Sequence, residues 1–313
     1  MKKGRNNAPL ALVALFAAAV LSACNDAAAY NNRGIAYGKK GDYDQAIEDF
    51  TQALRLDLNY AEAYSNRGNA YSAKGDYDRA IADYTEAIRL DPNDADAYYN
   101  RGLVYGNKGD YDRSIADYTE ALRLNPNDAV AYNSRGIAYD DKGDSGRAIA
   151  DYTEAIRLDP NDAVAYNNRG IAYGQKGDHD RAIVDFNQAL RLDPNYAEAY
   201  NNRGLVYGKK GDYDRAIADY SQALRLNPNY AMAYNNRGLT YGNKGDYDRA
   251  IADYTEALRL NPNDAEAYNS RGIAYASKGD FARARTDWEK ALQLDPNDAN
   301  ARKNLERLRS MGY

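Results

Sequence analysis

Side chains that could perform covalent chemistry are scarce in this chain. The 313 residues include one cysteine, Cys24, and one histidine, His179, which lie far apart in the sequence. A catalytic nucleophile needs a general base beside it, and a metal site needs several ligands close together. The 46 acidic residues are spread along the chain and form no obvious pair. We therefore expect no enzymatic activity, no cofactor and no metal site.

Asparagine is the polar residue with the most regular spacing. Pairs of neighbouring asparagines recur, for example at Asn167 and Asn168 and again at Asn201 and Asn202. A carboxamide donates and accepts hydrogen bonds at once, so it can bond a peptide backbone without reading its side chains. The recurrence indicates a binding surface that is repeated along the chain.

The asparagines are positioned by an internal repeat of 34 residues. A repeat of this length is typical of a solenoid. Eight copies span 27–60, 61–94, 95–128, 129–162, 163–196, 197–230, 231–264 and 265–298. They are marked by glycines at the same spacing: Gly34, Gly68, Gly102, Gly136, Gly170, Gly204, Gly238 and Gly272.

Counted from its first alanine, each copy has Tyr at position 4, Gly at 8, Tyr at 11 and Ala at 27, and seven copies have Ala at 20 and Pro at 32. In these positions the chain resembles the tetratricopeptide repeat. The resemblance implies an all-α, right-handed superhelical solenoid of helix-turn-helix repeats that binds proteins or peptides.

The pattern within one copy supports two helices by itself. Apolar and small residues at positions 4, 8 and 11, and again at 20, 24, 27 and 28, lie on one face of a helix. Gly at position 15 can end the first helix and Asp at 16 can cap the second. One such pair cannot bury its own apolar stripe, so we expect the eight copies to form a single stack. Residues 299–313 are expected to form a capping helix that covers the last copy with Leu305 and Leu308.

Arginine at position 7 of every copy is the main departure from the resemblance, which implies a large apolar residue there. A buried charge needs a partner. Asp at position 23 also occurs in every copy, so we predict an ion pair between positions 7 and 23. The alternative is a solvated arginine whose stem covers apolar surface.

The leader carries the signals for export. A basic start, Met1 to Arg5, precedes a mostly apolar run over 8–20 that is too short to span a membrane comfortably. Residues 21–24 read Leu-Ser-Ala-Cys and resemble the bacterial lipobox, which implies cleavage after residue 23 and lipid on Cys24. Residues 24–26 would form a short tether, and the alternative is an ordinary secretory signal. We expect a lipid-anchored protein on the extracytoplasmic side of a bacterial envelope, at the outer membrane facing the periplasm in a Gram-negative host.

The charge of the chain argues against nucleic acid as a partner. The formal charge is −5, and loss of Lys2, Lys3 and Arg5 with the leader takes it to −8. An acidic surface does not attract nucleic acid or anionic lipid headgroups. We therefore expect contact with the membrane only through the lipid.

By the resemblance, the first helices line the concave groove and present positions 2, 5, 6, 9, 12 and 13 to a partner. Position 6 resembles the asparagine ladder in the repeats of O-linked N-acetylglucosamine transferases. The alternative is that these asparagines serve the fold or solvate a helix face. The expected groove residues are Asn32, Asn66, Asn100, Asn168, Asn202, Asn236, Asn133, Asn167, Tyr99 and an apolar floor of Val130, Ile137, Val164 and Ile171.

The sequence thus favours a non-enzymatic adaptor, anchored to the membrane, that binds a protein or an extended peptide in its groove and acts in the cell envelope. The alternative is a structural spacer or a self-associating scaffold, which includes a homo-oligomer.

Overall fold

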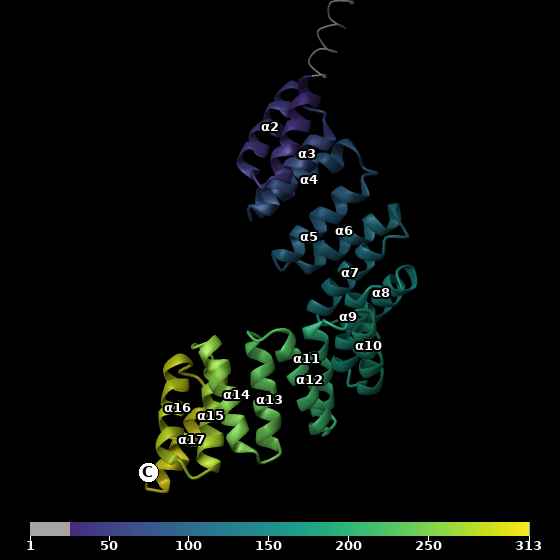
Figure 1. Cartoon of the computed structure of the whole chain (residues 1–313). Helices are drawn as coiled ribbons and strands as arrows, with labels where there is room; N and C mark the ends of the chain where they lie inside the picture. Colours follow the sequence, from purple (N-terminus) through teal and green to yellow (C-terminus); the bar gives the residue numbers. More distant parts are fainter. Residues whose placement is uncertain (1–25, 313) are drawn as a thin grey trace, which may run out of the picture. The chain divides into compact units, whose positions relative to one another are not determined.

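The computed structural model describes residues 26–312, and every regular element in this part of the chain is a helix. The chain forms two compact units, the first ending at Asp159 and the second beginning at Pro160. The single stack of eight copies that the sequence predicts is thus divided within the fourth repeat. Within each unit, antiparallel helix pairs pack side by side in chain order (Figure 1).

Each repeat contributes a first helix and a second helix. The first repeat opens with helical residues 26–39. The other first helices are α3 (Ala61–Ala73), α5 (Ala95–Asn107), α7 (Ala129–Asp141), α9 (Ala163–Gln175), α11 (Ala197–Lys209), α13 (Ala231–Asn243) and α15 (Ala265–Ser277). The second helices are α2 (Tyr43–Leu56), α4 (Tyr77–Leu90), α6 (Tyr111–Leu124), α8 (Ser145–Leu158), α10 (His179–Leu192), α12 (Tyr213–Leu226), α14 (Tyr247–Leu260) and α16 (Phe281–Leu294).

The turn between the two helices of a repeat follows the predicted chemistry. The glycines at position 15 have φ between 76° and 86°, a left-handed conformation that favours glycine. The aspartate at position 16 then caps the second helix. Asp144, for example, accepts a hydrogen bond from the amide of Arg147 at 3.0 Å. Each hairpin is therefore closed by two local interactions that the repeat encodes.

The glycine at position 8 lets the two helices approach closely. A methyl group added at Gly68 would lie 2.9 Å from the ring of Tyr84, the aromatic residue at position 24. Tyr84 is 1% exposed, so the ring has no room to move. The aromatic ring thus fills the space that the missing side chain leaves.

The arginines at position 7 pair with the aspartates at position 23 in all eight repeats, as predicted. The two salt-bridged side chains come from the two helices of one repeat, and both carboxylate oxygens of the aspartate accept a hydrogen bond. In the second repeat, Arg67 donates to the two oxygens of Asp83 at 2.7 and 2.8 Å and also to Thr51 of the preceding repeat at 3.0 Å. The guanidinium therefore ties the two helices of its own repeat together and links them to the repeat before.

The C-terminal helix α17 (Ala299–Ser310) closes the second unit, as expected. Leu305 and Leu308 are buried against Trp288, while the charged residues of α17 face solvent. In the described part of the chain, no helix has the length and apolar character that crossing a bilayer requires.

Candidate protein-binding surface

The asparagines at position 5 lie inside the packing between repeats. Asn31 is 0% exposed, and Asn201 is 2% exposed. Asn167, expected in the groove, is only 4% exposed, so the expectation that it faces a partner is wrong. Asn133 is half-buried. The helical period places a residue on one face but does not show how much of that face the next repeat covers.

The buried amides are satisfied by the repeat that follows. The amide nitrogen at position 6 of one repeat donates to the amide oxygen at position 5 of the repeat before. A buried amide oxygen without a donor costs about 1–3 kcal/mol, so these bonds stabilise the stack. The pairs are Asn66 to Asn31 at 3.1 Å in the first unit, and Asn202 to Asn167 at 3.1 Å and Asn236 to Asn201 at 3.0 Å in the second.

The helix α17 continues this pattern, which the sequence analysis did not identify. Asn304 donates to the side-chain oxygen of Asn269 at 3.1 Å. Asn304 lies 34 residues after Ser270, which is the residue at position 6 of the last repeat. Asn304 therefore occupies the equivalent of position 6 in the capping helix. Extending the repeat register into the tail would have revealed it. The capping helix therefore satisfies the buried amide of the last repeat and also covers its apolar side chains.

The asparagines at position 6 remain partly at the surface. Asn32 is exposed. The other five are half-buried: Asn66, Asn100, Asn168, Asn202 and Asn236. The amide nitrogens that donate to the neighbouring repeat are already used within the fold. A ligand could therefore bond only the remaining hydrogen and the oxygen of such a carboxamide.

Tyr99 replaces the amide at position 5 of the third repeat. Its hydroxyl is 3.2 Å from the hydroxyl oxygen of Ser134, the residue at position 6 of the next repeat. Its ring lies 5.4 Å from the ring of Tyr118. The pair of Tyr99 and Ser134 thus replaces an amide pair between consecutive repeats, and Tyr99 is half-buried.

Exposed aliphatic side chains gather at positions 2 and 9 of the first helices. We call these residues the aliphatic row and describe it separately for each unit. In the first unit it consists of Leu103, Val130 and Ile137, with exposures of 41%, 61% and 41%. In the second unit it consists of Val164, Leu205, Met232, Leu239 and Ile273, with exposures from 39% to 58%. Several exposed apolar side chains on neighbouring helices are typical of protein interaction sites.

The predicted apolar floor is present in part. Val130 and Ile137 are exposed in the first unit, and Val164 is exposed in the second. Ile171 is half-buried and packs against the cluster around Phe186, so it lies deeper than expected. Carboxylates accompany the row, because position 2 carries exposed Glu62, Asp96, Glu198 and Glu266 in other repeats. The surface therefore combines apolar contact with negative charge.

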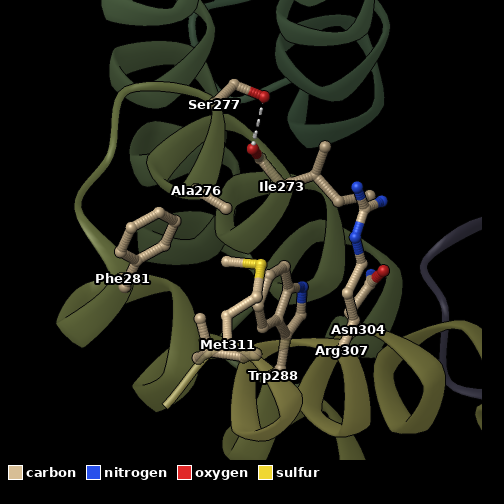
Figure 2. Close-up of a pocket in the computed structure, with 9 residues that line it drawn as sticks. Ile273, Ala276, Ser277, Phe281, Trp288, Asn304, Arg307 and Met311 are labelled. Carbon is tan, nitrogen blue, oxygen red and sulfur yellow. Dashed lines mark hydrogen bonds between the residues drawn. The ribbon is translucent and has the colours of Figure 1, made fainter. Parts of the chain in front are cut away.

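A pocket also opens at the C-terminal end of the second unit, between α15, α16 and α17 (Figure 2). Ile273, Phe281, Trp288 and Met311 supply its apolar walls, and Arg307 is its only charged lining residue. It has a volume of about 270 Å³. Its wall includes the end of the aliphatic row, so the C-terminal cap extends that surface.

No group of three or more His, Cys, Asp or Glu side chains in the described part of the chain could hold a metal ion. His179 begins α10 between Asp178 and Asp180, in a shallow depression of the surface. Cys24, the expected lipid attachment site, lies outside the described residues.

Comparison with protein families matches most of the chain to one family. Profiles described as tetratricopeptide repeat match residues 27–60, 95–128 and 197–230, residues 235–299, and residues 50–82 and 117–150. A further profile described as TPR repeat matches residues 68–109, 138–177 and 173–211. No curated protein matches the chain.

Solved structures share the fold. A chain in the crystal structure of the APC/C hetero-tetramer Cut9-Hcn1 matches with a TM-score of 0.65 and 22% identity, over 85% of this chain and 52% of that one. A tetratricopeptide repeat protein from Parabacteroides merdae has a TM-score of 0.64 and 22% identity, over 79% of this chain and 98% of that one. Pseudomonas aeruginosa pilF has a TM-score of 0.60 and 20% identity, over 68% and 97%. This chain spans about half the length of the matched Cut9-Hcn1 chain.

At these identities, the likeness to solved structures shows the fold alone. The family profiles, the 34-residue period and the paired helices agree with one another. The chain belongs to the tetratricopeptide repeat family.

Proposed function

We propose that this protein is a non-enzymatic adaptor that binds a protein partner, in extended form, along the exposed side of its first helices. Tetratricopeptide repeat proteins bind proteins or peptides, and their fold is generally a scaffold without catalytic residues. The observation that carries the proposal is the aliphatic row. Its members are all aliphatic and exposed, and they recur on consecutive first helices within each unit.

The packing of the repeats favours the row over the asparagines as the main source of affinity. An exposed apolar side chain gains about 25 cal/mol for each Å² that a partner covers. Four position 5 amides are buried, namely those of Asn31, Asn167, Asn201 and Asn269, and the position 6 amides of Asn66, Asn202 and Asn236 already give one donor to the fold. Half-buried Asn168, Asn202 and Asn236 then supply single backbone contacts beside the row. Each is worth only about 0.5–1.5 kcal/mol, so binding in the micromolar range is expected.

The two helices of one repeat provide a matched pair of exposed valines that tests the surface. Val164 lies on the first helix α9 and is 45% exposed, and Val184 lies on the second helix α10 and is 65% exposed. We expect Val164→Asp to weaken capture of the native partner, because it places a charge in the apolar contact. Val184→Asp adds the same charge on the other helix and should leave capture unchanged.

The measurement is quantitative mass spectrometry of envelope proteins retained by the full chain and by each variant. Circular dichroism checks that both variants keep their helix content. Loss of the partner with Val184→Asp but not with Val164→Asp would place recognition on the second helices. Retention of the chain itself as the sole specific protein would favour the self-associating scaffold.

We further propose that lipid on Cys24 anchors the adaptor to the extracytoplasmic face of a bacterial membrane. The support is the sequence alone: a basic start, a short apolar run and Leu-Ser-Ala-Cys at residues 21–24. Two or more acyl chains hold a protein stably at a membrane. Cys24→Ala should abolish incorporation of labelled palmitate, and unchanged labelling would refute the anchor. Fractionation of the membranes tests the outer-membrane location.

A further inference from the structure

The amide pairing between consecutive repeats is interrupted at one place in the second unit. Position 6 of the last repeat is Ser270 instead of asparagine, so the amide oxygen of Asn235 lacks the donor that Asn167, Asn201 and Asn269 receive. This oxygen is buried and has no hydrogen-bond partner. Serine is shorter than asparagine and has no carboxamide, so no donor reaches the oxygen of Asn235 from this position.

The orientation of the Asn235 side chain is fixed by its other end. Its amide nitrogen donates to a carboxylate oxygen of Asp264 at 2.8 Å. The reverse orientation would bring the amide oxygen against that carboxylate, which is unfavourable. The second oxygen of Asp264 accepts from the backbone amide of Ala267 at 3.0 Å and so caps α15. The free acceptor at Asn235 is therefore a property of the fold.

A cavity of about 410 Å³ opens at this point. Met232 and Leu239, both members of the aliphatic row, form one wall and are 58% and 53% exposed. Ser270 and Asn235 form part of its lining. The cavity therefore places an apolar wall next to an acceptor that needs a donor.

The charge of the cavity selects the kind of donor. Among the described residues that line it, Asp264 and Glu266 are acidic and none is basic. Tyr254 also lines it, and burial raises the pKa of this tyrosine to about 12, so its hydroxyl stays protonated and adds no charge at neutral pH. A cationic donor is complementary to this lining, and an anionic one is not.

We infer that this cavity, the Asn235 pocket, binds a lysine side chain of the partner. The inference rests on the proposed function, because the lysine belongs to the segment that lies along the aliphatic row. The four methylene groups of lysine cover Met232 and Leu239, and the ammonium binds the carboxylate of Glu266. Because the oxygen of Asn235 is covered in the folded chain, the Ser270 side chain rotates aside so that the ammonium can also donate to it. A compact ammonium with three donors suits one recessed acceptor better than a planar guanidinium does.

Methionine offers a direct readout of the pocket. The chain has three methionines, of which Met232 lines the Asn235 pocket and Met311 lines the separate C-terminal pocket. The full chain labelled with ¹³C at the methionine methyl groups can be titrated with an acetylated and amidated heptapeptide, Ala-Ser-Ala-Lys-Ala-Ser-Ala. The same peptide with norleucine in place of lysine keeps the stem and removes the charge.

We expect the lysine peptide to shift the methyl resonance of Met232 and leave that of Met311 in place. The norleucine peptide should bind about tenfold more weakly, since a hydrogen bond to a charged donor is lost. Equal binding of the two peptides, or no shift of Met232, would overturn the inference. In either case the test of Val164 and Val184 still decides the proposed function.

Ser270→Asn supplies the missing carboxamide and provides the second test. It should raise the midpoint of thermal unfolding by roughly 2–4 °C, because the oxygen of Asn235 gains a donor. It should also weaken the binding of the lysine peptide at least tenfold, because that oxygen is then no longer available to the peptide. Asn202→Ser is the matched control, since it creates the same defect opposite Asn167 and should lower the midpoint by a similar amount. Unchanged peptide binding by Ser270→Asn would show that the serine serves only the fold. If this variant does not fold, the norleucine comparison on the unmodified chain still decides.

Discussion

The guanidinium of Arg237 on α13 holds the carboxylate of Asp253 on α14 by two hydrogen bonds of 2.8 Å each. A third bond of 3.0 Å runs to the hydroxyl of Ser221 in the preceding repeat. The hydrogen bonds that Arg237 donates to Asp253 raise the pKa of the arginine, so it stays charged. Asp253 is only 5% exposed, so its carboxylate is largely removed from solvent. The side chain of Arg237 thus links its own helix α13 to α14 through Asp253 and to α12 through Ser221.

Arg237→Ala should lower the free energy of unfolding by about 3 kcal/mol or more, because it leaves the buried charge of Asp253 without a partner. Urea denaturation followed by circular dichroism measures the loss. Arg249→Ala is the control, since Arg249 is an exposed arginine on α14 and surface ion pairs contribute about 0–1 kcal/mol. Combining Arg237→Met with Asp253→Leu should recover much of the loss. Equal effects of the two alanine variants would show that the buried pair is not stabilising.

Two glycines of α9 should respond oppositely to alanine. A methyl group at Gly170 would lie 2.8 Å from the ring of Phe186, whereas at Gly174 the nearest atom, on Val206, is 3.6 Å away. Gly170→Ala should cost about 1–3 kcal/mol through overpacking. Gly174→Ala should gain about 0.5–1 kcal/mol from the reduced freedom of the unfolded chain. The midpoints of thermal unfolding check both, and a stable Gly170→Ala protein would contradict the tight contact.

Asn304→Ala should loosen the C-terminal cap, because the buried oxygen of Asn269 then loses its donor at a cost of about 1–3 kcal/mol. Hydrogen exchange should accelerate in α17 and in the adjoining part of α15. Asn300→Ala changes an exposed asparagine of the same helix and serves as the control. Equal exchange in the two variants would mean that the amide pair does not hold the cap.

Stability should fall at alkaline pH because of the tyrosines at position 24. Burial raises the pKa of Tyr84, Tyr118, Tyr152, Tyr220 and Tyr254, the last to about 12. A raised pKa in the folded state means that the stability is fully present below the pKa of the unfolded state, about 10, and is lost as the pH rises above it. Tyrosinate absorbance and circular dichroism between pH 9 and 13 should therefore change together. Ionisation of these tyrosines without loss of helix would contradict their burial.

Much of the fold can be predicted from the sequence, because each repeat carries its own instructions. The glycine at position 15, the aspartate cap at 16 and the pair of Arg and Asp at 7 and 23 are local signals, and the structure confirms them. The division of the chain after Asp159 is not predicted, since the period continues through that point without a change.

The binding surface is harder to predict, because helical spacing does not show which side chains the next repeat covers. Asn167 and Ile171 share a helix with Val164, yet only Val164 is exposed. The burial of Asn167 depends on a donor 35 residues further along the chain, at Asn202. Such a relationship becomes visible only when the stacking of the repeats is known.

The central claim is that the aliphatic row of the first helices holds the partner. The most direct test places a photoreactive amino acid at Leu205 on α11 or at Val184 on α10, each in the full chain produced in its native host. Illumination and mass spectrometry then identify the crosslinked protein. We predict a specific partner adduct from position 205 and none from position 184. A partner adduct from position 184 alone would contradict the account.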